Sequence, residues 1–295
     1  EQLADQTKPT HELLVTLGTG QQSPPLFLIH DADGEVSPYL NLAQQLDRPV
    51  YGVRTRLHPQ GIPYHSRITT MAADYREAIQ SIQPEGPYLL GGLCAGGVLA
   101  FEVALQLQSQ GDRVDLVALL EAPDVAAEER ARPGLLERMR SRLSNPTPDR
   151  FITALQKIPP KAIGYLSYKV SSVWEQHVTQ RRAHQLQRRQ GQPGTLPQSL
   201  QRLSIRDVYL FAEQGYAPKA SFSGAVLLVK ATAGSNADRP YHEIYTDPLF
   251  GWQSRVTQSV QVVQVPGGHS TMLSADNVKN VVAAIEQAIA EANSR

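Results

Sequence analysis

Cysteine is nearly absent from this chain, which contains a single residue of that type, Cys94, among 295. One thiol cannot form a disulfide within the chain, and it excludes a zinc site built from several cysteines. An excess of either charge is also absent, because 28 basic side chains balance 28 acidic ones. Without a basic surplus, electrostatics give no support to a nucleic-acid-binding or membrane-surface role, and we expect neither partner.

Long apolar runs are missing too, so we expect no membrane-spanning segment and no secretory leader. A cytoplasmic protein is the simplest interpretation. The chain begins at Glu1 rather than at methionine, and its first residues are polar and without a periodic pattern. We therefore expect residues 1–12 to form a linker, and the chain to be a segment of a longer polypeptide.

Apolar residues nevertheless make up 41% of the chain, which is enough for a sizeable core. In the first third, apolar runs of strand length alternate with stretches whose apolar residues recur at helical spacing. The expected strands are 13–17, 26–29, 49–53, 88–91 and 114–120, and the expected helices are 37–46, 69–82 and 98–108. This alternation predicts an α/β fold, with a mostly parallel central sheet and helices on both of its faces.

The pattern changes after residue 121 and returns near residue 219. Between these positions the sequence is charged and rich in Gln and Arg, and it predicts helices, among them 162–190 and 203–213. Strand patterns resume at 225–230 and 258–265, and a last helix is expected at 277–289.

This change in pattern suggests how the chain is divided. We expect residues 13–124 and 219–295 to form two parts of one α/β core. Residues 125–218 would then be a helical insertion over the carboxyl ends of the strands, in the position of a lid. A separate helical domain is the alternative for this stretch.

The sequence Gly92-Leu93-Cys94-Ala95-Gly96 lies between an expected strand and an expected helix. A strand, a G-x-nucleophile-x-G turn and a helix form a nucleophile elbow, here with cysteine where serine usually stands. The turn is too tight for side chains on its flanks, which accounts for the glycines. The start of the helix favours both a thiolate and a negatively charged intermediate beside it. A small buried core residue is the alternative for Cys94.

A nucleophile of this kind needs a base, and the base needs an acid that orients it. His269 follows an expected strand in a glycine-containing loop near the end of the chain, and it alone among eight histidines combines these properties. Glu121 ends an expected strand and is the candidate acid, with Asp124 on the same loop as the alternative. Cys94, Glu121 and His269 follow the chain order of an α/β-hydrolase triad.

Acyl chemistry also requires donors for the oxyanion of the tetrahedral intermediate. We expect the backbone N–H of Ala95, directly after the nucleophile, to be one donor. The N–H of Ala32, in the loop after strand 26–29, is the candidate for the other. The side chains of His30 and Asp31 lie on the same loop, and we expect structural roles for both.

Three segments carry a resemblance to a known family: Pro87-Tyr88-Leu89-Leu90-Gly91-Gly92, Leu119-Leu120-Glu121 and Pro266-Gly267-Gly268-His269. In order and spacing they resemble the thioesterase domains at the C-terminal ends of non-ribosomal peptide synthetases and polyketide synthases, over roughly residues 11–290. The resemblance implies an α/β-hydrolase fold with a helical lid. It also implies a triad of Cys94, Glu121 and His269, although the family usually has serine and aspartate at the first two positions.

The resemblance further implies a substrate and a partner. The family receives an acyl or peptidyl chain from the phosphopantetheine arm of a carrier protein, here expected to be the preceding domain of the same synthase. No cofactor and no metal of its own are expected. The nucleophile would accept the chain as an acyl-enzyme, and water or an internal amine or hydroxyl would release it. Hydrolysis is the default expectation, and cyclisation is the alternative.

Two other functions stay open. One is a cysteine hydrolase similar to dienelactone hydrolases, which use Cys, Asp and His on this fold but lack a large helical lid. The other is a docking module without catalytic activity, suggested only by the two unusual triad members.

Overall fold

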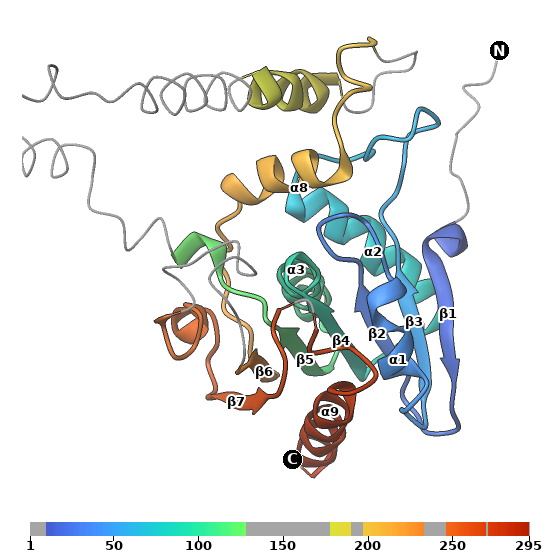
Figure 1. Ribbon diagram of the computed structural model, residues 1–295, viewed down its shortest axis with the longest axis vertical. Helices are drawn as coiled ribbons and strands as arrows, with labels where there is room; N and C mark the ends of the chain where they lie inside the picture. Colours follow the sequence, from blue (N-terminus) through green and yellow to red (C-terminus); the bar gives the residue numbers. More distant parts are fainter. Residues whose placement is uncertain (1–9, 128–177, 190–196, 233–245, 270, 295) are drawn as a thin grey trace, which may run out of the picture.

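The computed structural model describes residues 10–127, 178–189, 197–232, 246–269 and 271–294 (Figure 1). Within them, seven strands form one sheet in the order β1-β3-β2-β4-β5-β6-β7. The strands are β1 (Leu14–Thr19), β2 (Leu26–Ile29), β3 (Pro49–Val53), β4 (Tyr88–Leu93), β5 (Val114–Leu120), β6 (Ala225–Ala231) and β7 (Val260–Val265). Only β1 runs antiparallel to its neighbour, β3.

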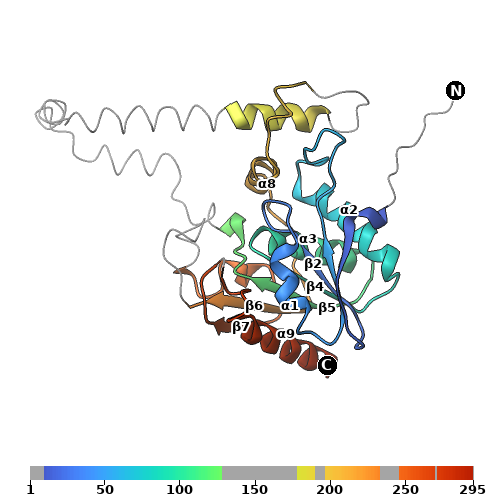
Figure 2. The same cartoon turned by 45° about the vertical axis from the view of Figure 1, so that its right-hand side comes forward.

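Helices cover both faces of this sheet (Figure 2). The named helices are η1 (Thr10–Leu13), η2 (Ser37–Tyr39), α1 (Leu40–Ala43), α2 (Ile68–Ile82), α3 (Ala95–Ser109), α8 (Ile205–Gln214), η4 (Trp252–Ser254) and α9 (Val278–Asn293). α2 and α3 lie on one face, and α1 and α9 lie on the other. The predicted fold class is therefore confirmed, with a mostly parallel sheet between two helical layers.

The apolar character of the central strands explains this arrangement. Every residue of β4 and β5 is buried, as expected for parallel strands that are covered on both faces. Alternate side chains of these strands enter two separate hydrophobic clusters, one under α2 and α3 and the other under α1 and α9. The carboxyl ends of β2, β4, β5, β6 and β7 consequently meet at one edge, where loops can bring distant residues together.

Some element boundaries differ from those that the sequence predicts. The helix expected over 37–46 is a 3-10 turn followed by a single turn of α-helix that ends at Ala43. The helix expected to start at residue 98 starts at Ala95, because the two glycines after Ala95 are helical. β1 does not pair with β2, which follows it in the chain, but with β3 at the edge of the sheet.

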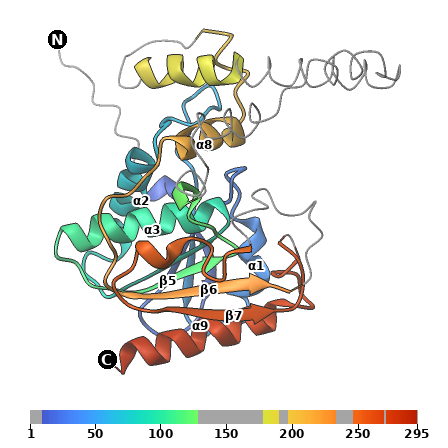
Figure 3. The ribbon, with the colours of Figure 1, turned by 90° about the vertical axis from the view of Figure 1, so that its left-hand side faces the viewer.

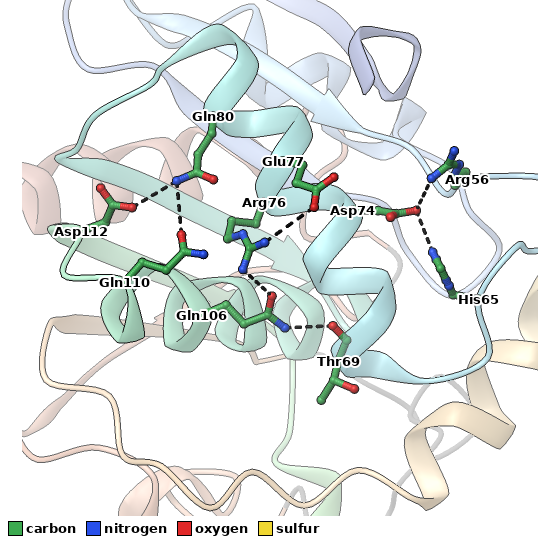
Figure 4. Close-up of polar contacts among 10 residues, drawn as sticks. All are labelled: Arg56, His65, Thr69, Asp74, Arg76, Glu77, Gln80, Gln106, Gln110 and Asp112. Carbon is green, nitrogen blue, oxygen red and sulfur yellow. Dashed lines mark hydrogen bonds and ion pairs between the residues drawn. The ribbon is translucent and has the colours of Figure 1, made fainter. Parts of the chain in front are cut away.

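Polar side chains fix α2 against α3 (Figure 4). Gln106 on α3 accepts a hydrogen bond from Arg76 and donates one to the carbonyl oxygen of Thr69, at distances of 3.5 and 2.9 Å. Gln80 on α2 donates to the Asp112 carboxylate at 3.1 Å, just beyond the end of α3. These contacts along the length of α2 hold it in register with the helix that follows the elbow.

Part of the predicted insertion lies within the described residues. Residues 178–189 are helical and pack on α8, where Ala183 and Leu186 are buried and His184 meets Phe211 edge to face at 4.7 Å. In Figure 3, α8 and helix 178–189 form successive layers on the α2 side of the molecule. Residues 128–177 and 190–196 lie outside the described residues, so the lid stays a prediction. No helix among the residues described is long and apolar enough to cross a membrane.

Candidate active site

Cys94 occupies the sharp turn between β4 and α3. Its backbone has φ 53° and ψ −114°, a conformation that L-residues rarely adopt and that costs ~1–3 kcal/mol. A Cβ atom on Gly92 would lie 2.2 Å from the carbonyl carbon of Gly96, and one on Gly96 would lie 2.3 Å from the carbonyl oxygen of Ile29. The two glycines therefore allow the turn to close and α3 to approach β2. The strained backbone holds the thiol at the carboxyl edge of the sheet.

His269 reaches the same edge from the loop after β7. The turn that precedes it requires glycine at position 267, where φ is +97° and a Cβ atom would lie 2.7 Å from Asn277 Nδ2. Gly268 donates to the Thr271 hydroxyl at 2.8 Å and accepts from the N–H of Met272 at 2.9 Å. These contacts fix the loop, and the His269 side chain is only 13% exposed.

Glu121 lies directly after β5 and is completely buried. Its backbone has φ 47°, and its N–H donates to the Val229 carbonyl oxygen at 2.9 Å. One carboxylate oxygen, Oε1, accepts a hydrogen bond of 2.6 Å from the N–H of Ala231 at the end of β6. The other, Oε2, lies 3.6 Å from Nδ1 of His269. Glu121 thus links the ends of β5 and β6 to the loop after β7.

The environment of His269 favours its protonated form. Burial alone lowers the pKa of His269, but a hydrogen bond with Cys94 and the neighbouring Glu121 carboxylate outweigh burial and raise the pKa to about 9. Because Nδ1 faces Glu121, the nitrogen available to Cys94 is Nε2. The imidazole therefore lies between the thiol and the carboxylate, which is the order that nucleophilic catalysis requires.

Asp124, the alternative acid, has other contacts. Its carboxylate lies 2.9 Å from Arg255 Nε and accepts a hydrogen bond of 3.1 Å from the N–H of Ala126. Its own N–H donates to the carbonyl oxygen of Phe250. Both Asp124 and Arg255 are buried. These contacts join the loop after β5 to residues 250–255. The carboxylate that lies beside His269 and raises its pKa is that of Glu121.

The two backbone N–H groups that the sequence predicts as oxyanion donors, those of Ala95 and Ala32, lie near the ends of neighbouring strands. Ala95 is the first residue of α3 and is buried, and Ala32 is half-buried in the loop after β2. β2 pairs with β4 in parallel, with Ile29 opposite Gly92, so both donors are at the same edge as Cys94. Within the part of the chain that the structure describes, neither N–H donates to a protein acceptor.

A buried hydroxyl that the sequence did not single out joins these two strand ends. Tyr39 Oη donates to the carbonyl oxygen of Ile29 at 2.6 Å and accepts from the N–H of Leu93 at 2.8 Å. Tyr39 is fully buried, and burial raises the pKa of its hydroxyl, which stays protonated. Its bonding partners are backbone groups on distant strands, and no local sequence pattern signals such partners.

The described residues offer no obvious place for a metal. Among them, no group of three or more His, Cys, Asp or Glu side chains is arranged to hold an ion. The donor set at the elbow, with one thiol, one imidazole and one carboxylate in series, suits proton transfer and nucleophilic attack.

Comparisons with known proteins point to one family. The sequence profile of the thioesterase domain family matches residues 24–289. Atromentin synthetase nps3 of Serpula lacrymans is 37% identical over 126 residues, which are 42% of this chain and 13% of that protein. Polyketide synthase PksR of Bacillus subtilis is 42% identical over 120 residues, which are 40% of this chain and 5% of that protein. The chain thus matches a small part of the length of each curated relative.

Solved structures show the same fold. The Vlm2 thioesterase domain bound with a dodecadepsipeptide has a TM-score of 0.59 and 20% identity, with 95% of this chain and 98% of that domain covered. The surfactin thioesterase domain SrfTE has a TM-score of 0.54 and 16% identity, with 95% and 97% covered. Since the family profile spans most of the sequence, this chain belongs to the thioesterase domain family, whose enzymes cleave thioesters.

Proposed function

We propose that this chain is a chain-releasing thioesterase of natural-product biosynthesis, with Cys94 as the acyl acceptor. The observation that carries the proposal is the series of Cys94, His269 and Glu121 at one edge of the sheet, with Glu121 Oε2 3.6 Å from His269 Nδ1. The similarity of part of the chain to multidomain synthetases and a polyketide synthase supports this setting.

In the first step, the Cys94 thiolate attacks the carbonyl carbon of an incoming thioester. A bond forms between Sγ and that carbon, and the carbonyl oxygen becomes an oxyanion that the N–H groups of Ala95 and Ala32 would stabilise. The intermediate collapses, the bond to the departing thiol breaks, and protonated His269 supplies the proton that the thiol requires. The pKa of about 9 means that His269 carries this proton at neutral pH.

In the second step, His269 acts as a base. The Cys94 side chain is a larger cause of the raised His269 pKa than Glu121 is, so acylation of Cys94 removes much of that effect. The neutral imidazole then accepts a proton from water, or from an amine or hydroxyl of the bound chain, as that group attacks the acyl carbon. Collapse of the second intermediate restores the Cys94 thiolate and releases the product as an acid, an ester or an amide.

Glu121 would orient the imidazole throughout both steps. Its Oε1 is held by the N–H of Ala231, so Oε2 keeps a fixed direction toward Nδ1. A carboxylate in this position fixes the tautomer of the imidazole and stabilises its charged form. The distance of 3.6 Å exceeds a direct hydrogen bond, and such contacts commonly shorten in the substrate complex.

A cysteine nucleophile has a chemical consequence for product release. The acyl-enzyme is a thioester, which keeps more of the reactivity of the incoming thioester than a serine ester would. Attack by an amine, or closure of a strained ring, is correspondingly easier than from an ester. Hydrolysis and cyclisation are both compatible with this site.

The substrate that we propose is an acyl or peptidyl chain on the phosphopantetheine arm of a carrier protein, a preceding domain of the same synthase. The test is to load a carrier protein with an acyl chain and to identify the released product by mass spectrometry. A free acid indicates hydrolysis, and a product lighter by one water indicates cyclisation. Turnover of a small cyclic ester without any turnover of the carrier-bound thioester would contradict the proposal and favour a dienelactone-hydrolase-like activity.

A further inference from the structure

We propose that His30 and Tyr75 are positioning residues of the oxyanion hole, which fix the direction in which the N–H of Ala32 points. This inference rests on the proposed function and names residues that act through the backbone rather than on the substrate. It is derived from the hydrogen bonds of a fully buried histidine at the end of β2.

The contacts of His30 determine its tautomer. Nδ1 lies 2.6 Å from the carbonyl oxygen of Asp31, which can only accept, so Nδ1 carries the hydrogen. Nε2 lies 2.6 Å from Tyr75 Oη, and in a neutral ring it accepts a hydrogen bond from the tyrosine hydroxyl. Burial lowers the pKa of His30, which keeps the ring neutral.

This chain of hydrogen bonds ends on one particular peptide group. The oxygen of Asp31 and the hydrogen of Ala32 belong to the same peptide unit, and in a trans peptide they point in opposite directions. The Asp31 oxygen is held by His30 Nδ1 and by the N–H of Gly34, at 2.6 and 3.1 Å. The N–H of Ala32 is therefore directed away from both of these donors.

The loop leaves this N–H available. The N–H of Asp31 donates to the Glu35 carbonyl oxygen, and that of Gly34 donates to the Asp31 carbonyl oxygen. The N–H groups of Asp33 and Glu35 both donate to the Asp31 side chain, at 2.9 and 3.0 Å. Among residues 31–35, Ala32 is thus the one whose N–H has no protein acceptor in the part of the chain that the structure describes. Because backbone N–H groups in folded proteins are almost always paired with protein or with water, this N–H is open to a water molecule or to an atom of a bound ligand.

The support for the loop comes from α2. Tyr75 lies in the middle of α2 and is buried, and α2 is fixed to α3 by the side-chain contacts of Figure 4. α3 begins with Ala95, the other candidate donor. The His30–Tyr75 contact therefore links the position of one donor to the helix layer that carries the other.

Two reactions of the Cys94 thiol can distinguish positioning of the oxyanion hole by His30 and Tyr75 from a general contribution of these residues to the fold. Acylation by an N-acetylcysteamine thioester passes through an oxyanion, whereas alkylation by iodoacetamide attacks a saturated carbon and forms none. Both reactions use Cys94, which is the single cysteine of the chain. A residue that positions the oxyanion hole should affect the first rate and leave the second unchanged.

The variants are His30→Leu, which removes both nitrogens, and Tyr75→Phe, which removes only the hydroxyl. We expect the acylation rate to fall about 100-fold in the first and about 10-fold in the second, since loss of one oxyanion donor costs ~10²–10³. His30→Asn places an amide N–H near the position of Nδ1 and should recover part of the loss. Tyr88→Phe, which removes a buried hydroxyl at the opposite end of β4, is the control and should change neither rate.

Equal acylation rates in wild type, His30→Leu and Tyr75→Phe would overturn the proposal. A parallel loss of acylation and alkylation in folded variants would also overturn it, because the substitutions would then act on Cys94 itself. If His30→Leu does not fold, the comparison of Tyr75→Phe with Tyr88→Phe decides the question. A wild-type protein that is alkylated but never acylated would instead refute the proposed function and this inference with it.

Discussion

Glu121 and His269 are 148 positions apart (269 − 121), yet Glu121 Oε2 lies 3.6 Å from His269 Nδ1. The second oxygen of the same carboxylate is held by a backbone N–H of β6, so the acid is fixed from two strands at once. This arrangement supports the proposal that Glu121 is the carboxylate that orients the imidazole. It also distinguishes Glu121 from Asp124, whose carboxylate pairs with Arg255.

The first prediction separates these two acids by substitution. Glu121→Gln should lower kcat/KM for an acyl thioester by roughly 100-fold or more, because the charged form of His269 loses its stabilising partner. Asp124→Asn should instead lower the free energy of unfolding by about 3 kcal/mol, because Arg255 loses its buried partner. Steady-state kinetics and urea unfolding measure the two effects. The reverse pattern, with catalysis lost only in Asp124→Asn, would make Asp124 the acid.

The second prediction concerns the titration of His269. Its pKa should be about 9 in the wild type, and lower in Cys94→Ala and in Glu121→Gln, because both side chains raise it. The Cys94 substitution should have the larger effect. Proton NMR of the imidazole across pH 5 to 10 measures this directly, and a wild-type value near 6.5 would be inconsistent with the geometry.

The third prediction follows from the raised pKa of His269 and concerns the stability of the fold. A histidine whose pKa is higher in the folded state than in the unfolded state stabilises the fold at low pH. The stability that wild type gains over Glu121→Gln should therefore be fully present below about pH 6.5, and it should be lost as the pH rises through about 9. Urea unfolding at a series of pH values tests this, and a difference that grows with pH would contradict it.

The fourth prediction concerns the hydroxyl of Tyr39. Tyr39→Phe leaves the Ile29 carbonyl and the Leu93 N–H without this partner, which should destabilise the protein by about 1–3 kcal/mol. Because these groups flank the oxyanion donors, acylation by a thioester should also slow. The control is Tyr88→Phe, whose hydroxyl contacts the Gln83 carbonyl oxygen far from the elbow. Equal effects of the two substitutions on acylation would exclude a specific role for Tyr39.

The fifth prediction concerns the glycine at the end of the elbow. Gly96→Ala would place a Cβ atom 2.3 Å from the Ile29 carbonyl oxygen, so α3 and β2 would have to separate. We expect a loss of stability of ~3 kcal/mol or more and no measurable acylation. Gly215→Ala is the matched control, because φ there is −94° and the nearest atom to a Cβ lies at 3.9 Å. A folded, active Gly96→Ala variant would contradict the close contact between α3 and β2.

The sequence was sufficient to predict the sheet and its helices, because apolar runs and helical spacing are local signals. It also predicted Cys94, Glu121 and His269 as candidate triad residues, because a strand-end position and flanking glycines can be recognised in the sequence without knowledge of the fold. The structure brings these three residues together. The predicted lid and the boundaries at 1–12 and 125–218 depend largely on residues outside those described, and they stay predictions.

The residues that the sequence did not reveal share a physical property. Tyr39 and Tyr75 act through hydroxyl contacts with groups that are distant in the chain, and Arg255 meets Asp124 only through the folded core. None of these side chains lies in a motif, and tyrosines at helical spacing are expected to be ordinary core residues. Such partners become visible only when the strand ends are placed together.

The most direct test of the central claim is intact-mass measurement of the protein mixed with an acyl N-acetylcysteamine thioester, followed by peptide mapping. The account predicts a transient mass increase equal to one acyl group, located on Cys94, which decays as product is released and is absent from Cys94→Ala. Release of product at the wild-type rate by folded Cys94→Ala, or the absence of any adduct or turnover in folded wild-type protein between pH 6 and 9, would contradict it.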